Sequence, residues 1–306
     1  MENGNKKGIL ICGHGSRDTE ATDAFKEMVD KIQERHKDTP VDYGFLEFAK
    51  PTFDVAVKNL YDQGVRDIIS LPGIIFPGGH AKNDMPYEMN TLQNQYEDLR
   101  IRFGTFVGVS PNILKLSQRL IEEAEERHGH YDRKDTCLLV VGRGTSDPDG
   151  NASVAKLTRF LWEGMGFGFA TNAFIGVTQP LLKDALPVID HLPYKRVIAI
   201  PFFLFTGVLL KKIYAQLDEF NEQTEKEIVK VDNFGSDELI LEAFDERIQE
   251  VEEGSPNMNC QVCKYRKQIV GFEDEVGKEQ VGHHFHVRGS GQGDGHHHHH
   301  DHDHSH

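Results

Sequence analysis

The sequence contains little cysteine, little positive charge and no long apolar run. Four cysteines in 306 residues, two of them in a C-x-x-C pair, argue against a disulfide framework, so we expect a reducing, cytoplasmic environment. The formal net charge of −15 argues against a nucleic-acid partner, because phosphate binding needs a basic face. No apolar stretch is long enough to cross a bilayer, and the polar start of the chain does not resemble a signal peptide. We therefore expect no membrane partner.

The chain alternates short β-branched runs with amphipathic helical stretches. Residues 9–12 predict a buried strand, which is followed by the glycine-flanked His14 and by a helix from about Asp18 to Lys37. Further strands are predicted to end near Glu47, Leu71, Val107, Val141, Ile175, Ile200 and Val231. Strands that alternate with helices predict an α/β fold with parallel sheets flanked by helices. In such folds, ligands bind beyond the carboxyl ends of the strands.

An internal repeat is the most informative feature of the sequence. Its two copies are related by a constant offset of 129 residues, the separation of Gly13 from Gly142. The offset also pairs Gly15 with Gly144, Phe45 with Phe174, Pro51 with Pro180, Pro72 with Pro201, Phe76 with Phe205, Gly78 with Gly207 and Lys82 with Lys211. Beyond these residues the register drifts, and we match Val107 with Val231. The repeat predicts two similar α/β lobes, residues 6–130 and 134–252.

The composition changes in the last region, residues 253–306. Residues 254–259 predict a linker, and a Met-x-Cys-x-x-Cys motif ends in Cys260 and Cys263. We expect most of the chain after about residue 270 to be a flexible, disordered tail. Its histidines predict transient metal binding: His283, His284, His286, His296 to His300, His302, His304 and His306. An expression tag is the alternative origin of the last residues, but the interspersed Asp301 and Asp303 favour a native metal-gathering tail.

Comparing the two copies of the repeat locates a candidate site. His14, Glu47 and His80 each lie near the end of a predicted strand or in the loop that follows it. Their equivalents in the second copy are Arg143, Gly176 and Leu209. Residues needed only for folding should often be kept in both copies, so this loss indicates function. Two neutral imidazoles bind borderline divalent ions such as Co²⁺, Fe²⁺, Ni²⁺ or Zn²⁺, and imidazole and carboxylate also accept protons.

Small and basic residues around this site predict a seat for substrate carboxylates. They are Ser16, Arg17, Gly78, Gly79, Lys82, Arg143, Lys211 and Lys212. Lys82 and Lys211 are repeat equivalents and would flank the cleft from both sides. Glycine-rich turns that open onto helix N-termini also attract anions. Ordinary solvated lysines are the alternative interpretation.

Three stretches resemble the class II tetrapyrrole chelatases: residues 13–17 (Gly-His-Gly-Ser-Arg), residues 46–52 and residues 72–80. The two-lobe length, the cysteine motif and the histidine-rich tail resemble the long form of the sirohydrochlorin cobaltochelatases. The resemblance implies insertion of Co²⁺ into sirohydrochlorin on the anaerobic route to cobalamin. It implies that His14 and His80 are catalytic and bind cobalt, and it places Glu47 at the family's acidic position.

The resemblance also implies an iron–sulfur centre of the [4Fe–4S] type at Cys260 and Cys263. The spacing alone leaves zinc, a redox dithiol and a cluster equally open, because two thiolates are half of a usual four-ligand site.

Two alternative functions stay open. One is the same chemistry with iron, as in a sirohydrochlorin ferrochelatase that makes sirohaem, because ligand type does not separate these ions. The other is a cytoplasmic metal-storage or metallochaperone protein, in which the tail performs the function. The sequence also leaves the oligomeric state open, a homo-oligomer included.

Overall fold

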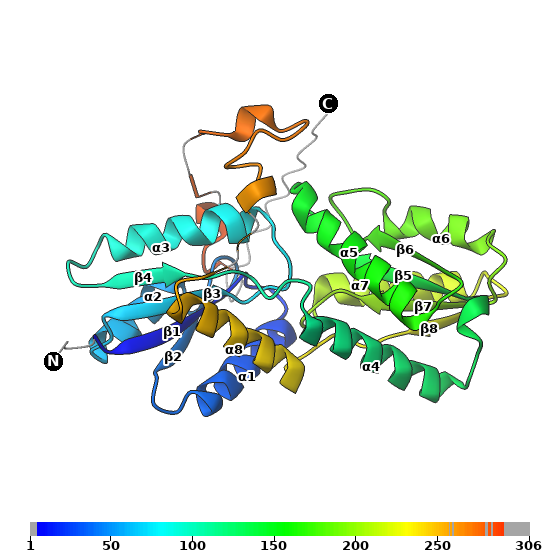
Figure 1. Cartoon of the computed structure of the whole chain (residues 1–306), viewed down its shortest axis with the longest axis horizontal. Coiled ribbons are helices and arrows are strands. Elements are labelled where there is room, and N and C mark those ends of the chain that lie inside the picture. The colour runs from blue at the N-terminus through cyan, green and yellow to red at the C-terminus, as the bar shows by residue number, and fades with distance from the viewer. Residues whose placement is uncertain (1–4, 257, 259, 279–280, 283, 291–306) are drawn as a thin grey trace.

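The computed structural model places the first half of the chain in one parallel sheet of strand order β2-β1-β3-β4 (Figure 1). The structure describes residues 5–256, 258, 260–278, 281–282 and 284–290. The strands are β1 (Lys7–Gly13), β2 (Val41–Phe45), β3 (Asp67–Pro72) and β4 (Arg100–Phe103). The helices are α1 (Thr19–Arg35), α2 (Phe53–Asp62), the π-helix η1 (His80–Asp84), α3 (Met85–Gln93) and α4 (Pro111–His128). β1 and β3 are buried along most of their length, which explains their continuous apolar runs.

The second half repeats this arrangement in a sheet of order β6-β5-β7-β8. Its strands are β5 (Thr136–Gly142), β6 (Phe169–Phe174), β7 (Arg196–Pro201) and β8 (Glu227–Lys230). Its helices are α5 (Pro148–Met165), α6 (Leu182–Asp190), α7 (Val208–Asn221) and α8 (Glu238–Glu252), with short 3₁₀ turns η2 (Arg133–Asp135), η3 (Cys260–Val262), η4 (Glu273–Glu275) and η5 (Phe285–Val287). β5 and β7 begin and end 129 residues after β1 and β3, so the predicted α/β fold with two similar parallel sheets is confirmed. None of the described helices is long and apolar enough to span a membrane.

The fourth strand of the first half ends earlier than predicted. The expected strand end near Val107 is wrong, since β4 ends at Phe103. Gly104 and Val231 each donate a backbone hydrogen bond to the neighbouring third strand, so Gly104 is the counterpart of Val231. Val107 is a buried loop residue of the core. Its apolar side chain extends the strand-like pattern past the point where the strand stops.

Each half contributes its last helix to the other half. α4 packs against α5, β7 and β8, whereas α8 packs against α1 and β3 (Figure 1). The Arg102 guanidinium donates a hydrogen bond of 2.9 Å to the Val251 carbonyl, which ties β4 to α8. One buried apolar cluster runs through both halves. Residues 6–130 and residues 134–252 therefore each form one sheet, but the last helix of each segment packs against the other segment.

Reciprocal ion pairs also join the two halves. The Lys82 ammonium lies 2.7 Å from an Asp147 carboxylate oxygen and 2.8 Å from one of Asp149. The same contacts recur at 2.9 and 2.7 Å among the three counterparts at the 129 offset, namely Lys211, Asp18 and Glu20. Such reciprocity is the signature of an isologous interface. The two halves therefore contact each other through equivalent surfaces.

The chain after α8 folds back over the first half, where it is coloured orange in Figure 1. His284 is buried, and its Nε2 lies 2.9 Å from a Glu88 carboxylate oxygen on α3. The Phe48 amide donates to the Val287 carbonyl at 2.9 Å. The sequence predicts a flexible tail from about residue 270 but could not reveal these contacts of residues 284–290, because the partner of His284 lies far away in the sequence. His283 and residues 291–306, which hold the long histidine run, lie outside the described residues.

Candidate functional site

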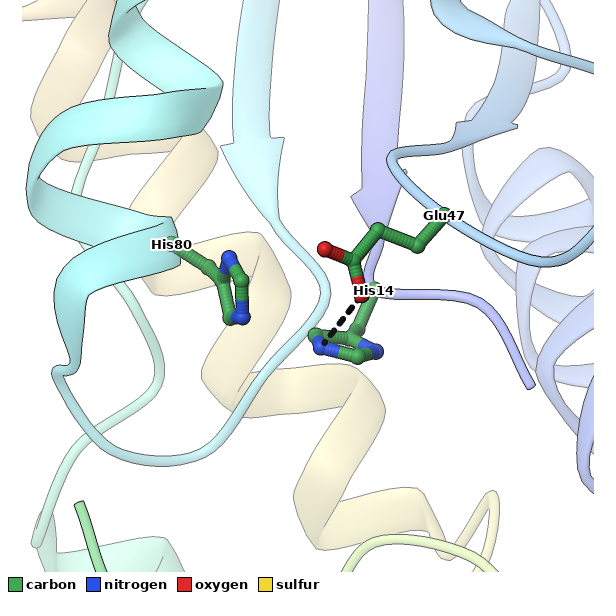
Figure 2. A group of neighbouring side chains, drawn as sticks. All are labelled: His14, Glu47 and His80. Carbon is green, nitrogen blue, oxygen red and sulfur yellow. Dashed lines mark ion pairs between the residues drawn. The ribbon is translucent and has the colours of Figure 1, made fainter. Parts of the chain in front are cut away.

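His14, Glu47 and His80 meet beyond the carboxyl ends of three adjacent strands (Figure 2). His14 directly follows β1, Glu47 lies in the loop after β2, and His80 begins η1 after the loop that follows β3. One ring nitrogen of each histidine and one carboxylate oxygen lie within 4.8 Å of one another. The ring centroids are 4.6 Å apart. Within the described part of the chain, this is the only group of three histidine, cysteine or acidic side chains arranged to hold a metal ion.

The close approach of the first two loops requires Gly15. The Glu47 amide donates to the His14 carbonyl at 2.9 Å. Gly15 has a φ of +94°, and a Cβ on it would lie 1.8 Å from the Glu47 carbonyl oxygen. Phe48, with a φ of 57°, turns the chain back immediately after Glu47. The second glycine of the Gly-His-Gly motif thus allows the backbone to place the carboxylate next to the imidazole.

Hydrogen bonding leaves one nitrogen of His14 available. Its Nδ1 lies 3.0 Å from the Gly15 carbonyl, which can only accept, so Nδ1 carries the proton. Its Nε2 is buried, has no hydrogen-bond partner among the described residues and lies 3.6 Å from a Glu47 oxygen. Burial, with the charges of Arg143 and His80, lowers the pKa of His14 to about 3. The imidazole is therefore neutral and presents a lone pair to a cation.

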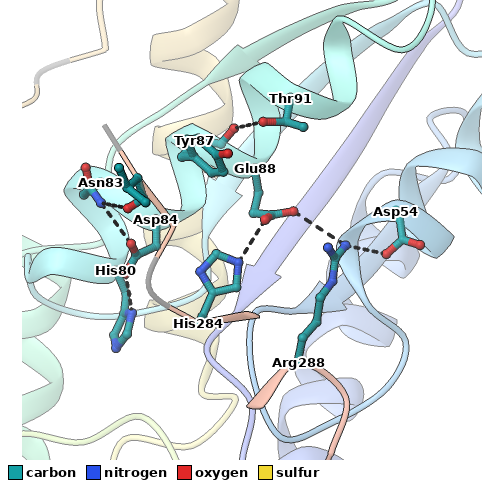
Figure 3. Close-up of polar contacts among 10 residues, drawn as sticks. Asp54, His80, Asn83, Asp84, Tyr87, Glu88, Thr91, His284 and Arg288 are labelled. Carbon is teal, nitrogen blue, oxygen red and sulfur yellow. Dashed lines mark hydrogen bonds and ion pairs between the residues drawn. The ribbon is translucent and has the colours of Figure 1, made fainter. Parts of the chain in front are cut away.

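Asp84 orients His80, a role that the sequence interpretation missed. The Nδ1 of His80 donates to an Asp84 oxygen at 2.8 Å, and Asn83 donates to the other oxygen at 2.9 Å (Figure 3). Burial alone would raise the pKa of Asp84, but these hydrogen bonds bring it below its ordinary value. The carboxylate fixes the tautomer of His80, which leaves Nε2 as the lone-pair nitrogen. The spacing of four residues on one helix is the signal that could have found it.

A cleft of about 1180 Å³ opens beside these side chains and between the two halves. Aromatic side chains from both halves line it: Phe25, Phe45, Phe48, Phe76, Phe202, Phe203 and Phe205. Basic side chains also line it: Arg17, Lys82, Arg143, Lys264, Arg266 and Lys278. An apolar cleft with a basic surround suits a flat aromatic molecule that carries carboxylates at its edge.

Most of the residues predicted to bind carboxylates line this cleft: Ser16, Arg17, Gly78, Gly79, Lys82 and Arg143. The Arg17 guanidinium lies 5.0 Å from the Phe48 ring centroid. The Ser16 hydroxyl accepts from the Asp18 amide at 3.0 Å, so it also shapes the turn before α1. Burial lowers the pKa of Arg143, and the nearby Glu47 carboxylate opposes this shift.

The two lysines that we expected to flank the cleft both pair with carboxylates, although Lys82 also lines the cleft. The Lys82 ammonium lies between the Asp147 and Asp149 carboxylates. Lys211 is absent from the cleft lining and pairs with acidic residues of the first half. In this structure the two lysines join the halves to each other. The remaining lysine of that set, Lys212, does not line the cleft either.

Cys260 and Cys263 are free thiols, and Cys263 is buried. Within the described residues, no third histidine, cysteine or carboxylate completes a metal site with them. The pair therefore supplies two thiolates, half of the ligands that a tetrahedral zinc or a [4Fe–4S] cluster uses.

Comparison with known proteins places the chain in a family. A family model described as CbiX matches residues 8–124 and again residues 137–251. A sirohydrochlorin cobaltochelatase of Priestia megaterium is 32% identical over 280 residues, which cover 91% of this chain and 88% of the relative. A sirohydrochlorin ferrochelatase of the same organism is 27% identical over 223 residues, covering 72% of this chain and 82% of the relative.

Solved structures share the fold. The structure of SirB from Bacillus subtilis with Fe³⁺ superimposes with a TM-score of 0.73 at 22% identity, covering 83% of this chain and 100% of the other. The sirohydrochlorin chelatase SirB from Bacillus subtilis subspecies spizizenii in complex with cobalt gives a TM-score of 0.69 at 22% identity, covering 81% and 96%. The family resemblance inferred from the sequence motifs is confirmed. With both copies of its repeat matched, the chain belongs to the CbiX family.

Proposed function

We propose that this protein inserts Co²⁺ into sirohydrochlorin, the reaction named for the cobaltochelatase relative. The observation that carries the proposal is the position of His14, Glu47 and His80. Their ligand atoms lie within 4.8 Å of one another, and both histidines line a cleft of about 1180 Å³. Such a cleft accommodates a molecule of tetrapyrrole size, and its basic residues complement substrate carboxylates.

Metal insertion exchanges two pyrrole N–H protons for one divalent ion. His14 and His80 offer lone-pair nitrogens to the incoming Co²⁺, and Glu47 offers a carboxylate. Three protein ligands leave coordination positions open for the ring nitrogens, so the ion can pass from the protein to the macrocycle. As the ion leaves, the released His80 imidazole and the Glu47 carboxylate accept the two pyrrole protons.

The cleft walls hold the substrate during this exchange. Aromatic side chains from both halves pack against the face of the macrocycle. Arg17 and Arg143 bind carboxylates at its edge, since a guanidinium matches a carboxylate with two parallel hydrogen bonds. The cleft holds the ring nitrogens close to His14 and His80. The bound metal and the macrocycle then react without first having to meet and orient in solution.

Iron is the alternative substrate metal, because imidazole and carboxylate accept Fe²⁺ as well as Co²⁺. The cobaltochelatase relative matches 91% of this chain and the ferrochelatase relative 72%, which favours cobalt. Chelation rates with Co²⁺, Fe²⁺ and Ni²⁺ under anaerobic conditions separate these activities. A higher rate with Fe²⁺ would assign the protein to sirohaem synthesis.

The [4Fe–4S] centre implied by the family resemblance does not fit the described residues, because Cys260 and Cys263 have no third ligand there. The centre stays a prediction that requires ligands from elsewhere, and no step of the mechanism uses it. Iron and sulfide analysis of anaerobically prepared protein tests it. The metal-storage alternative depends on residues 291–306, outside the described range, and leaves the grouping of His14, Glu47 and His80 unexplained.

Replacing either histidine tests the proposed function. In His14→Ala or His80→Ala, we expect the chelation rate to fall by about 10²- to 10⁴-fold, because each variant loses a metal ligand and His80→Ala also loses a proton acceptor. The rate is followed by the absorbance change of sirohydrochlorin mixed with Co²⁺. His130→Ala is the matched control, since this histidine is exposed in the loop between the two halves. Near-normal turnover in both active-site variants, with intact circular dichroism, would refute the assignment.

A further inference from the structure

The segment that carries the cysteine motif, residues 260–278, forms part of the cleft wall. Lys264, Tyr265, Arg266 and Lys278 line the cleft together with residues of both halves. A Cβ on Gly79, the residue before His80, would lie 3.1 Å from the Tyr265 hydroxyl. A segment far from the strand ends in sequence is thus in direct contact with the metal-site loop.

Lys264 is a buried residue that lines the cleft, and its ammonium has no carboxylate partner among the described residues. The residue is only 7% exposed. Its ammonium lies 4.9 Å from the Phe272 ring centroid and 5.2 Å from that of Tyr265. Aromatic faces attract a cation but replace only part of the solvation that burial removes. An anion that enters the cleft would supply the missing partner. Lys278, by contrast, lies 3.5 Å from a Glu275 oxygen.

Tyr265 complements this charge as a neutral donor. Burial, with the negative charges of Asp147 and Asp84, raises the pKa of Tyr265 to about 12. Its hydroxyl therefore keeps its proton at neutral pH and can donate a hydrogen bond to an anionic oxygen.

Contacts within the segment and C-terminal to it hold it in place. The Arg266 and Lys267 amides donate to the Cys263 carbonyl at 3.0 and 2.9 Å, which makes a turn around Lys264. Further along the chain, Asn83 donates to the Val281 carbonyl at 3.0 Å. Beyond it, His284 and Arg288 both contact the Glu88 carboxylate on α3 (Figure 3). Lys264 is therefore presented to the cleft by an anchored backbone.

We propose that Lys264 and Tyr265 bind a peripheral carboxylate of the tetrapyrrole, so that the cysteine-motif segment is a substrate-binding wall of the active site. This inference rests on the proposed function for the identity of the ligand. The paired ammonium and hydroxyl recognise the edge of the macrocycle and leave metal binding to His14, Glu47 and His80. Loss of Lys264 therefore weakens macrocycle binding and leaves metal binding unchanged.

The test compares Lys264→Met with Lys267→Met in the full chain. Lys267 is the matched control because it is exposed three residues away and does not line the cleft. In Lys264→Met, we expect the Kd and KM for sirohydrochlorin to rise about 10- to 100-fold, the loss typical of one charged hydrogen bond. We expect kcat and the KM for Co²⁺ to stay unchanged, and Lys264→Arg to recover most of the affinity. Kd is measured without metal, by titrating sirohydrochlorin absorbance.

An unchanged Kd for sirohydrochlorin in Lys264→Met would overturn the inference, and so would a loss confined to kcat or to Co²⁺ binding. If Lys264→Met fails to fold, Tyr265→Phe gives the same test, with an expected rise in Kd of about 3- to 10-fold for a neutral hydrogen bond. Wild-type protein that binds sirohydrochlorin through Lys264 but inserts no metal would refute the proposed function and support this inference.

Discussion

The two halves of the molecule share one loop architecture but differ in the chemistry that the loops carry. A Cβ on Gly15 would lie 1.8 Å from the Glu47 carbonyl oxygen, and a Cβ on Gly144 would lie 1.9 Å from the Gly176 carbonyl oxygen. Both loops therefore close on a glycine in the same way. The second loop has glycine where the first has Glu47, so the fold does not need the carboxylate. The comparison shows that the loop backbone requires the glycine, whereas Glu47 is present only in the half that contains the candidate site.

The ion pairs that join the halves show a second difference. The Lys82 side chain is 5% exposed and its partners Asp147 and Asp149 are 0% and 11% exposed. The counterpart Lys211 is 50% exposed. Equivalent contacts thus lie in two environments, one beside η1 in the interior and one at the surface. Their contributions to the free energy of unfolding should differ accordingly.

The largest expected effect is on stability, in Lys82→Met compared with Lys211→Met. Removing Lys82 leaves the buried Asp147 carboxylate without its cation, which costs about 3–5 kcal/mol. Removing Lys211 deletes a solvent-screened pair, so we expect a far smaller change. Urea denaturation of the two variants measures both free energies of unfolding. Equal decreases in the free energy of unfolding would contradict the expected difference between the buried and the exposed ion pairs.

The sequence was sufficient to predict the fold and to select His14, Glu47 and His80, which the structure brings within 4.8 Å of one another, as the candidate site. Glycine and proline keep their spacing at the turns of both copies, so the 129-residue offset reproduces β1 in β5 and β3 in β7. Parallel strands end at one edge of a sheet, which is why residues following three strands could be expected to meet.

The sequence could not predict the features that depend on tertiary contacts, namely the burial of individual side chains and the pairing of distant segments. Lys82 and Lys211 occupy equivalent positions, and no local pattern distinguishes the buried lysine from the exposed one. The pairing of His284 with Glu88 and the contact of Tyr265 with Gly79 join segments distant in the sequence. A histidine-rich stretch also resembles a disordered metal-binding tail until such a partner is known.

A second effect is expected at Asp84, whose equivalent in the second half is the buried Ile213. In Asp84→Ala, His80 loses the acceptor that fixes its tautomer, so we expect Co²⁺ affinity and chelation rate to fall about 10- to 100-fold. Asp84→Glu should recover part of the loss, which a purely structural role would not produce. Equilibrium dialysis with Co²⁺ measures the affinity. Wild-type affinity in Asp84→Ala would show that His80 needs no orienting carboxylate.

The smallest effect is a pH dependence of stability that belongs to the first half alone, since Arg143 replaces His14 in the second. The pKa of His14 is about 3 in the fold and 6.5 ordinarily, so below pH 6.5 the unfolded chain binds a proton that the fold does not. The free energy of unfolding therefore falls as the pH decreases through this range, by up to about 1.4 kcal/mol per pH unit.

His14→Gln removes this dependence because glutamine does not titrate. Denaturant unfolding at pH 7.5, 6 and 5 should show wild-type protein losing stability relative to the variant as the pH falls. Parallel stability curves for the two proteins would indicate that His14 is as easily protonated in the fold as in the unfolded chain.

The most direct test of the central claim is anomalous X-ray scattering from crystals soaked with Co²⁺. We expect one strong cobalt peak within bonding distance of His14, Glu47 and His80, and none at the equivalent loop ends, Arg143, Gly176 and Leu209. Cobalt bound elsewhere, with no density at His14 and His80, would contradict the assignment of the metal-handling site to the first half.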